Sequence, residues 1–209
     1  MLDSILGTDP AVRRIQSAAA RILHRIGVTA NVATIAAAII GVLAGVAFAV
    51  DHVGLGILLL AVSAALDAVD GTLAREFGGA STPFGGVMDL CFDRVVEAAV
   101  IIGLVWRHPE LDFYALLLVA SWYVNITVFL AVGAAMERTG PKLIDYPPGI
   151  LERTEAMIFF AVLALVESTH YLMWMGRVLC LAMTTLEIVT GAQRFLFGRA
   201  HLRNPLSRG

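Results

Sequence analysis

The chain has 209 residues, of which 58% are hydrophobic and 15% are charged, and its mean hydropathy is +0.80. This composition excludes an ordinary water-soluble domain, which is far less apolar. The formal net charge of −2 indicates no particular partner, and a nucleic acid is not expected among the partners. At roughly 20 residues per spanning helix, the length allows about six spans. We therefore expect an all-α, polytopic membrane helix bundle in which residues 1–209 form a single domain.

The N-terminal segment 10–26 has the pattern of an amphipathic helix that ends at Gly27. Its apolar stripe consists of Val12, Ile15, Ala19, Ile22, Leu23 and Ile26, and its basic edges of Arg13, Arg14, Arg21 and Arg25. Such a helix lies in the membrane interface and is attracted by anionic headgroups. A solvated cap on the bundle is an equal alternative. A cleavable signal peptide is not expected, because the first thirty residues lack an apolar core followed by a cleavage site.

Six apolar segments follow and form a predicted transmembrane bundle over residues 31–196. The predicted spans are residues 31–50, 54–73, 85–106, 111–135, 156–166 and 171–196. The fifth segment is short unless it starts near Leu151. Residues 197–209 are predicted to be a cytoplasmic tail.

Four aspartates stand where the second and third spans meet the same membrane face. Asp67 and Asp70 close the second span, and Asp89 and Asp93 open the third. Their spacings place each pair on one side of a helix. A charge at membrane depth costs about 2.5–3.5 kcal/mol, so such residues indicate a functional site. Clustered carboxylates suit hard cations, and four can hold two ions that clamp a phosphoryl displacement.

Two glycines, an alanine and an arginine lie in register with these aspartates. Gly71 allows a ligand to approach the backbone, and Arg75 can reach a phosphate. The pattern D-x2-D-G-x2-A-R, nine further residues and then G-x3-D-x3-D covers Asp67, Asp70, Gly71, Ala74, Arg75, Gly85, Asp89 and Asp93. It resembles the signature of the CDP-alcohol phosphotransferases (CDP-alcohol phosphatidyltransferases) at every fixed position. Length and hydropathy also fit a one-domain member of that family.

The resemblance implies a membrane transferase of phospholipid biosynthesis. Such an enzyme moves a substituted phosphate group, here expected to be phosphatidyl from CDP-diacylglycerol, to the hydroxyl of a small alcohol and releases CMP. It implies Mg²⁺ or Mn²⁺ in a two-ion site and a homodimer in the bilayer. The implied metal ligands are Asp67, Asp70, Asp89 and Asp93, with Asp93 also acting as the general base. The implied nucleotide-binding residues are Asp67, Asp70, Gly71, Ala74, Arg75, Gly85, Asn31 and Thr34.

Asn31 and Thr34 belong to a second, weaker match. The run from Thr29 to Thr34 resembles the T-P-N-x-x-T that opens the first span in this family, with Ala30 in place of the proline. Asn31 and Thr34 would then hydrogen-bond the diphosphate. Capping of the first helix is an equally good interpretation.

The acceptor alcohol is left open by the sequence. Family members that use a phosphorylated acceptor tend to carry basic residues at the cytoplasmic end of the fourth span, where this chain has Gly133 and Ala135. This difference disfavours inositol phosphate and glycerol 3-phosphate without excluding them, and serine, inositol and other small alcohols stay open. The candidate acceptor-binding residues are Arg138, Lys142 and Arg153, although Arg153 also fits an interfacial charge pair.

The distribution of positive charge predicts the orientation. Most arginines and lysines fall on the face that carries the aspartates, and only Arg107 and Arg177 lie near the other. By the positive-inside rule, both termini and the aspartates face the cytoplasm, in the cytoplasmic membrane.

Two other functions are compatible with intramembrane aspartates but fit the pattern less well. An intramembrane prenyltransferase also uses aspartates, Mg²⁺ and a diphosphate, but its two aspartate clusters are well separated. A divalent-cation transporter also carries intramembrane acids, but these would line a path near the bilayer midplane.

Overall fold

The structure is a computed structural model that describes residues 9–77, 83–137, 153–169 and 173–202. These residues form helices joined by short turns, which confirms the all-α prediction. The helices are α2 (Pro10–Arg25), α3 (Ala30–Ala49), α4 (Val53–Phe77), α5 (Pro83–Arg107), the 3₁₀-helix η1 (Pro109–Leu111), α6 (Asp112–Glu137), α7 (Arg153–Ser168) and α8 (Met173–Leu202).

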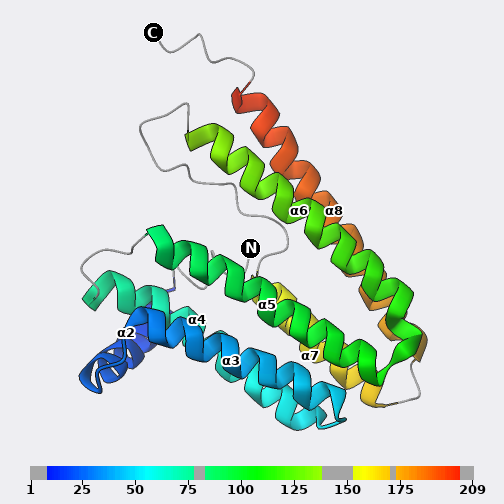
Figure 1. The fold of residues 1–209 in the computed structure, drawn as a ribbon, viewed down its shortest axis with the longest axis horizontal. Coiled ribbons are helices and arrows are strands. Elements are labelled where there is room, and N and C mark those ends of the chain that lie inside the picture. The colour runs from blue at the N-terminus through cyan, green and yellow to red at the C-terminus, as the bar shows by residue number, and fades with distance from the viewer. Residues whose placement is uncertain (1–8, 78–82, 138–152, 170–172, 203–209) are drawn as a thin grey trace.

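The helices form two limbs of a V (Figure 1). The first limb contains α3, α4, α5 and α7, and the second contains α6 and α8, which pack along each other. The limbs converge at η1, where α5 ends and α6 begins; we call this end the vertex. Helix α2 crosses the far end of the first limb and packs on α4.

The predicted N-terminal helix is present as α2. Asp9 caps it, since its carboxylate accepts from the backbone N–H of Ala11 at 2.7 Å. Gly27 follows with a φ of +80°, a conformation that glycine adopts at little steric cost. The Ser17 hydroxyl donates to Glu76 of α4 at 2.5 Å, so α2 is joined to the end of the helix that carries Asp67 and Asp70.

Two helices end later than predicted. Helix α4 continues to Phe77 instead of ending near residue 73, so Asp70 and Arg75 lie well inside it. Helix α8 continues to Leu202, six residues beyond the predicted sixth span, so residues 197–202 of the predicted cytoplasmic tail are helical. Arg199 and His201 in the last turn favour this helical end, because cations there complement the helix dipole.

By length and composition, four helical segments of the described chain can span a membrane. They are Ala30–Ala49, Val53–Phe77, Pro109–Met136 and Trp174–Leu202. Six spans were predicted, and the other two correspond to α5 and α7. Helix α5 carries several charged residues in its first half, and α7, at 16 residues, is about 24 Å long at 1.5 Å per residue. Both pack within the first limb.

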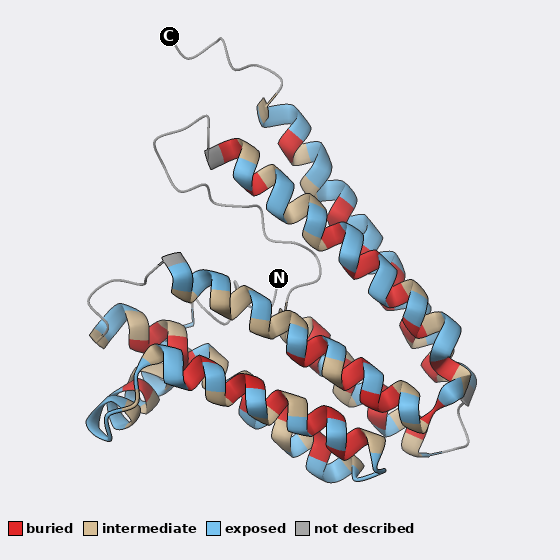
Figure 2. Ribbon diagram, viewed as in Figure 1, coloured by how far each residue is buried: buried red, intermediate tan, exposed pale blue. Residues whose placement is uncertain are grey.

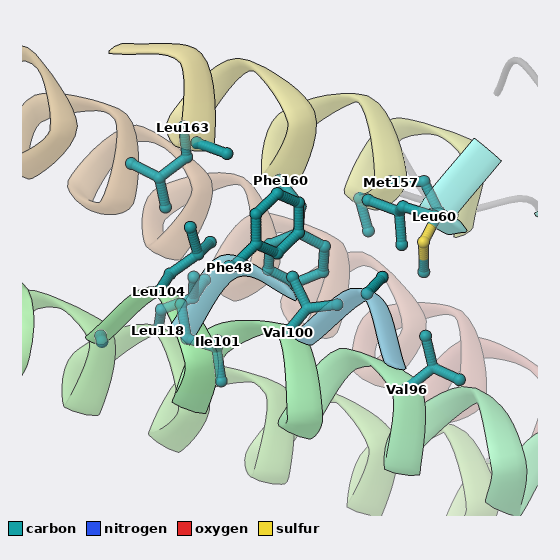
Figure 3. Close-up of a cluster of buried hydrophobic side chains, with 14 of the residues drawn as sticks. Phe48, Leu60, Val96, Val100, Ile101, Leu104, Leu118, Met157, Phe160 and Leu163 are labelled. Carbon is teal, nitrogen blue, oxygen red and sulfur yellow. The ribbon is translucent and has the colours of Figure 1, made fainter. Parts of the chain in front are cut away.

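The main apolar core is centred on α3, α5 and α7 and also takes in buried residues of α4, α6 and α8. Phe48 of α3, Val100 of α5 and Phe160 of α7 are almost fully buried and lie together (Figure 3). The buried residues of these helices face one another, whereas their outer faces are exposed (Figure 2). Outward apolar residues are what a bundle surrounded by lipid requires.

Helices α3 and α5 approach each other through glycines. A Cβ atom added to Gly103 would overlap the carbonyl oxygen of Gly45, and one added to Gly45 would overlap the carbonyl of Ala99. Only glycine permits this backbone contact, and small residues of this kind allow close helix packing in membranes. The contact holds the helix that carries Asp89 and Asp93 against α3.

Replacement of Gly103 by alanine should separate α3 from α5. We expect Gly103→Ala to lower the free energy of unfolding by about 1–3 kcal/mol, the usual cost of overpacking. Thermal unfolding in detergent measures the effect. The matched control is Gly54→Ala in α4, where a Cβ meets nothing within 4 Å. Equal melting temperatures for the two variants would contradict the proposed packing role.

Candidate active site

Three of the predicted aspartates come together between α4 and α5. Asp67, Asp89 and Asp93 each offer a carboxylate oxygen, and these atoms lie within 4.8 Å of one another. We call these three residues the acid cluster. Asp67 and Asp93 are largely buried, with 16% and 13% of their side chains exposed.

Arg153, the first residue of α7, lies among the three carboxylates. Its Nη1 forms an ion pair with Asp67, lies 2.5 Å from Asp93 Oδ1, and lies 3.9 Å from Asp89 Oδ1. One guanidinium therefore offsets part of the repulsion between three carboxylates that lie within a few ångströms. The sequence indicated Arg153 only as an acceptor-binding candidate or as part of a charge pair.

Asp70 lies beside the acid cluster and contacts α3. The Thr34 hydroxyl donates to Asp70 Oδ2 at 2.6 Å, and both side chains are buried. Thr34 thus connects the second, weaker motif, which runs from Thr29 to Thr34, to the aspartates of the signature. Helix α3 is capped by Thr29, whose hydroxyl accepts from the Val32 N–H, and Asn31 is exposed on the first turn.

The remaining signature residues lie on α4 and at the start of α5. The Arg75 guanidinium folds back along α4, where Nη2 donates to the Thr72 hydroxyl at 3.1 Å. A Cβ atom on Gly71 would lie 3.2 Å from Arg75 Nη1, so Gly71 provides the space for this conformation. Ala74 and Gly85 are half-buried. Arg138 and Lys142 lie outside the described residues.

The acid cluster fits a divalent cation. It offers only hard carboxylate oxygens, the donors that Mg²⁺, Mn²⁺ and Ca²⁺ prefer. Asp89 Oδ1 is buried and accepts no hydrogen bond from the described part of the chain. Arg153 Nη1, at 3.9 Å, is too distant to donate a hydrogen bond to this atom, so a bound cation would satisfy it.

A cavity of about 290 Å³ lies between the limbs and shares Arg153 with the acid cluster. We call it the polar pocket. It is lined by Leu90, Arg94, Glu97, Trp122, Asn125, Ile126, Phe129, Arg153, Ala156, Glu187 and Arg194, which come from α5, α6, α7 and α8.

Charged and amide groups in the polar pocket are paired. Arg94 Nη1 lies 2.8 Å from Glu97 Oε2, the Asn125 amide donates to Glu187, and Arg194 Nη1 donates to Asn125 Oδ1 at 2.9 Å. Arg94, Glu97, Asn125, Glu187 and Arg194 were not among the site residues predicted from the sequence. The signal was present, however, because ionisable side chains inside predicted apolar spans indicate a site.

Comparison with known proteins identifies the family. Residues 27–184 match the family model described as CDP-alcohol phosphatidyltransferase. The chain is 32% identical over 157 residues to the archaetidylinositol phosphate synthase of Pyrococcus horikoshii. This match covers 75% of this chain and 79% of that protein. It is 31% identical over 184 residues to the phosphatidylinositol phosphate synthase of Mycobacteroides abscessus. That match covers 87% of this chain and 82% of the relative.

Crystal structures of the phosphatidylinositol phosphate synthase of Mycobacterium tuberculosis have the same fold. The structure with CDP-DAG bound has a TM-score of 0.72 and 26% identity and covers 94% of this chain and 98% of its own. The structure in complex with manganese and citrate has a TM-score of 0.73 and 25% identity, with 93% of each chain covered. The signature, the fold and these matches agree, and the chain belongs to the CDP-alcohol phosphatidyltransferase family.

Proposed function

We propose that this protein transfers the phosphatidyl group of CDP-diacylglycerol to a hydroxyl of an inositol phosphate and releases CMP. One observation carries the proposal: Arg153 joins the acid cluster directly to the polar pocket. A cation-binding group for the diphosphate and a polar cavity for a small acceptor therefore share a wall. Family membership supports the transferase class and disfavours the prenyltransferase and the cation transporter.

The composition of the polar pocket supports a phosphorylated polyol. Its three guanidinium groups, from Arg94, Arg153 and Arg194, suit a phosphate. The carboxylates of Glu97 and Glu187 and the amide of Asn125 suit hydroxyl groups. The names of the bacterial and archaeal relatives point to the same product class. The sequence disfavoured this acceptor because of Gly133 and Ala135, but here α5, α7 and α8 supply the cationic groups.

Unphosphorylated inositol is the second candidate acceptor. A CDP-diacylglycerol–inositol 3-phosphatidyltransferase of Candida albicans is 26% identical over 149 residues, and it covers 64% of this chain. The two buried carboxylates of the pocket are compatible with an acceptor that carries only hydroxyls.

In the proposed mechanism, the four aspartates of the signature hold Mg²⁺ or Mn²⁺. Manganese is present in one structure of the M. tuberculosis relative. When bound, such ions would offset negative charge on the diphosphate. The small residues Gly71, Ala74 and Gly85 leave room for the nucleotide, with Asn31, Thr34 and Arg75 nearby as further contacts.

Asp93 is the proposed general base. Its carboxylate would accept the proton of the acceptor hydroxyl while that oxygen forms a bond to the lipid-side phosphorus and the bond to CMP breaks. Arg153 stabilises the ionised carboxylate that this role requires. Because Arg153 also lines the polar pocket, it is placed to orient the acceptor, and orientation supplies much of the rate when the base is weak.

We also propose that residues 1–209 form one domain and that the protein forms a homodimer in the cytoplasmic membrane. The acid cluster and both termini would face the cytoplasm, where CDP-linked substrates are found. The basic residues of α2 support this orientation by the positive-inside rule.

Loss of the Asp93 carboxylate should abolish transfer. We expect Asp93→Asn to reduce acceptor-dependent CMP release at least about 10²-fold, because the variant loses the general base. The assay uses purified protein in liposomes with CDP-diacylglycerol and Mg²⁺ or Mn²⁺. Asp112→Asn is the matched control, since Asp112 is exposed at the start of α6. Undiminished CMP release from a folded Asp93→Asn protein would refute the assignment.

Arg194 should determine the affinity for a phosphorylated acceptor. We expect Arg194→Gln to raise the KM for inositol phosphate about 10- to 100-fold, as loss of a charge-assisted hydrogen bond predicts. The KM for CDP-diacylglycerol should change little. Arg199→Gln, on the exposed side of α8, is the matched control. Faster transfer to inositol than to inositol phosphate, with no effect of Arg194→Gln, would identify the unphosphorylated acceptor instead.

A further inference from the structure

A second cluster of ligating side chains lies at the vertex, which the proposed reaction does not use. His108 follows the end of α5, Glu110 lies in η1, and Glu167 lies in the last turn of α7. Asp93 and His108 are separated along α5 by about 22 Å at 1.5 Å per residue. The vertex cluster, defined as His108, Glu110 and Glu167, is therefore distinct from the acid cluster.

The geometry of the vertex cluster is compatible with a metal site. His108 Nδ1 lies 3.5 Å from Glu110 Oε1 and 3.6 Å from Glu167 Oε2, and one ligand atom from each residue lies within 4.8 Å of the others. These separations exceed the usual hydrogen-bond length of about 2.7–3.2 Å. They are close to the distance of about 3.3–3.4 Å between donors that surround a tetrahedral Zn²⁺ with bonds of about 2.0–2.1 Å.

The burial of Glu167 independently points to a cationic ligand. The residue is 2% exposed, and neither of its carboxylate oxygens accepts a hydrogen bond from the residues that the structure describes. Arg177 acts on it electrostatically, but its ion-pair partner within 4.0 Å is His108. A buried carboxylate whose oxygens accept no hydrogen bond is costly, and such a group normally pairs closely with a cation or binds a metal.

The surrounding chain makes room for this carboxylate. A Cβ atom on Gly176 of α8 would overlap Glu167 Oε1, so any other residue there would displace the side chain. His108 is also buried, at 5% exposed, whereas the Glu110 side chain is 25% exposed. An ion could therefore enter past Glu110 and be held by the two buried ligands.

We propose that His108, Glu110 and Glu167 bind a divalent transition-metal ion of the Zn²⁺ class. An imidazole with two carboxylates suits Zn²⁺, whereas Mg²⁺ prefers oxygen ligands alone. The ion links the end of α5, the turn into α6 and the end of α7, where the two limbs converge (Figure 1). Because the polar pocket lies between the same limbs, the metal stabilises their relative position.

The test must separate this site from the acid cluster. The full chain is purified with Asp67→Asn, Asp89→Asn and Asp93→Asn together, stripped with a chelator and titrated with Zn²⁺ or Co²⁺. We expect this protein to bind roughly one metal ion per chain. Zn²⁺ should raise its melting temperature, and bound Co²⁺ should show the intense visible absorption of a tetrahedral site with a nitrogen ligand. Activity is not the readout, so failure of this proposal leaves the proposed function untouched.

Three variants in the same background locate the ion. Glu167→Gln and His108→Asn should abolish the thermal shift and the Co²⁺ absorption, and the more exposed Glu110→Gln should weaken binding at least tenfold. The matched control is His52→Asn, an exposed histidine beside Asp51, which pairs with Arg107 at the same end of the bundle. Zn²⁺ binding that survives both Glu110→Gln and Glu167→Gln, or no binding by the parent protein, would overturn the proposal.

Discussion

The balance of charge between Arg153 and three aspartates is the constraint on which the site depends. Asp67, Asp89 and Asp93 converge in a largely apolar bundle, where like charges repel strongly. Arg153 can offset them only because α7 packs into the core through residues such as Phe160 and so places its first residue between α4 and α5. The apolar core and the charged site are therefore parts of one arrangement.

On the proposed function, this balance also couples the two substrates. A divalent cation in the acid cluster would replace the positive charge that Arg153 supplies there. The guanidinium would then be available to the polar pocket, whose wall it already forms. Donor binding would in this way prepare the acceptor site, and the transfer would occur where the two sites meet.

The clustering of signature aspartates and most of the helices could be predicted from the sequence, because both depend on local spacing. Aspartates three or four residues apart share a helix face whatever the rest of the chain does, and long apolar runs have few alternatives to helices. The predicted sixth span ends at residue 196, where the composition becomes polar, whereas α8 continues to Leu202. Polarity alone does not end a helix when the surrounding residues continue it and the last turn carries favourable cations.

Contacts between distant segments could not be predicted in this way. Arg94 and Arg194 line one cavity although a hundred residues separate them in the sequence. Likewise, His108, which follows α5, lies 3.6 Å from Glu167 of α7. Each of these residues has an ordinary local interpretation, as an interfacial charge or a turn residue. Only the packing of the limbs shows that they lie together. An ionisable residue inside an apolar span was the available signal, and it indicates importance without indicating the partner.

The packing of α6 against α8 explains why the absence of basic residues near Gly133 does not exclude a phosphorylated acceptor. A Cβ atom on Gly198 would lie 2.8 Å from Val132, so the two helices are closely packed at that level. Gly133 is itself buried, and a long basic side chain there would have little space. Arg194, one turn before Gly198 on α8, instead brings a guanidinium into the pocket and donates to Asn125 of α6. A positive charge that binds a phosphate must lie in the pocket, but its place in the sequence can vary. Because α6 and α8 are adjacent, either helix can provide it.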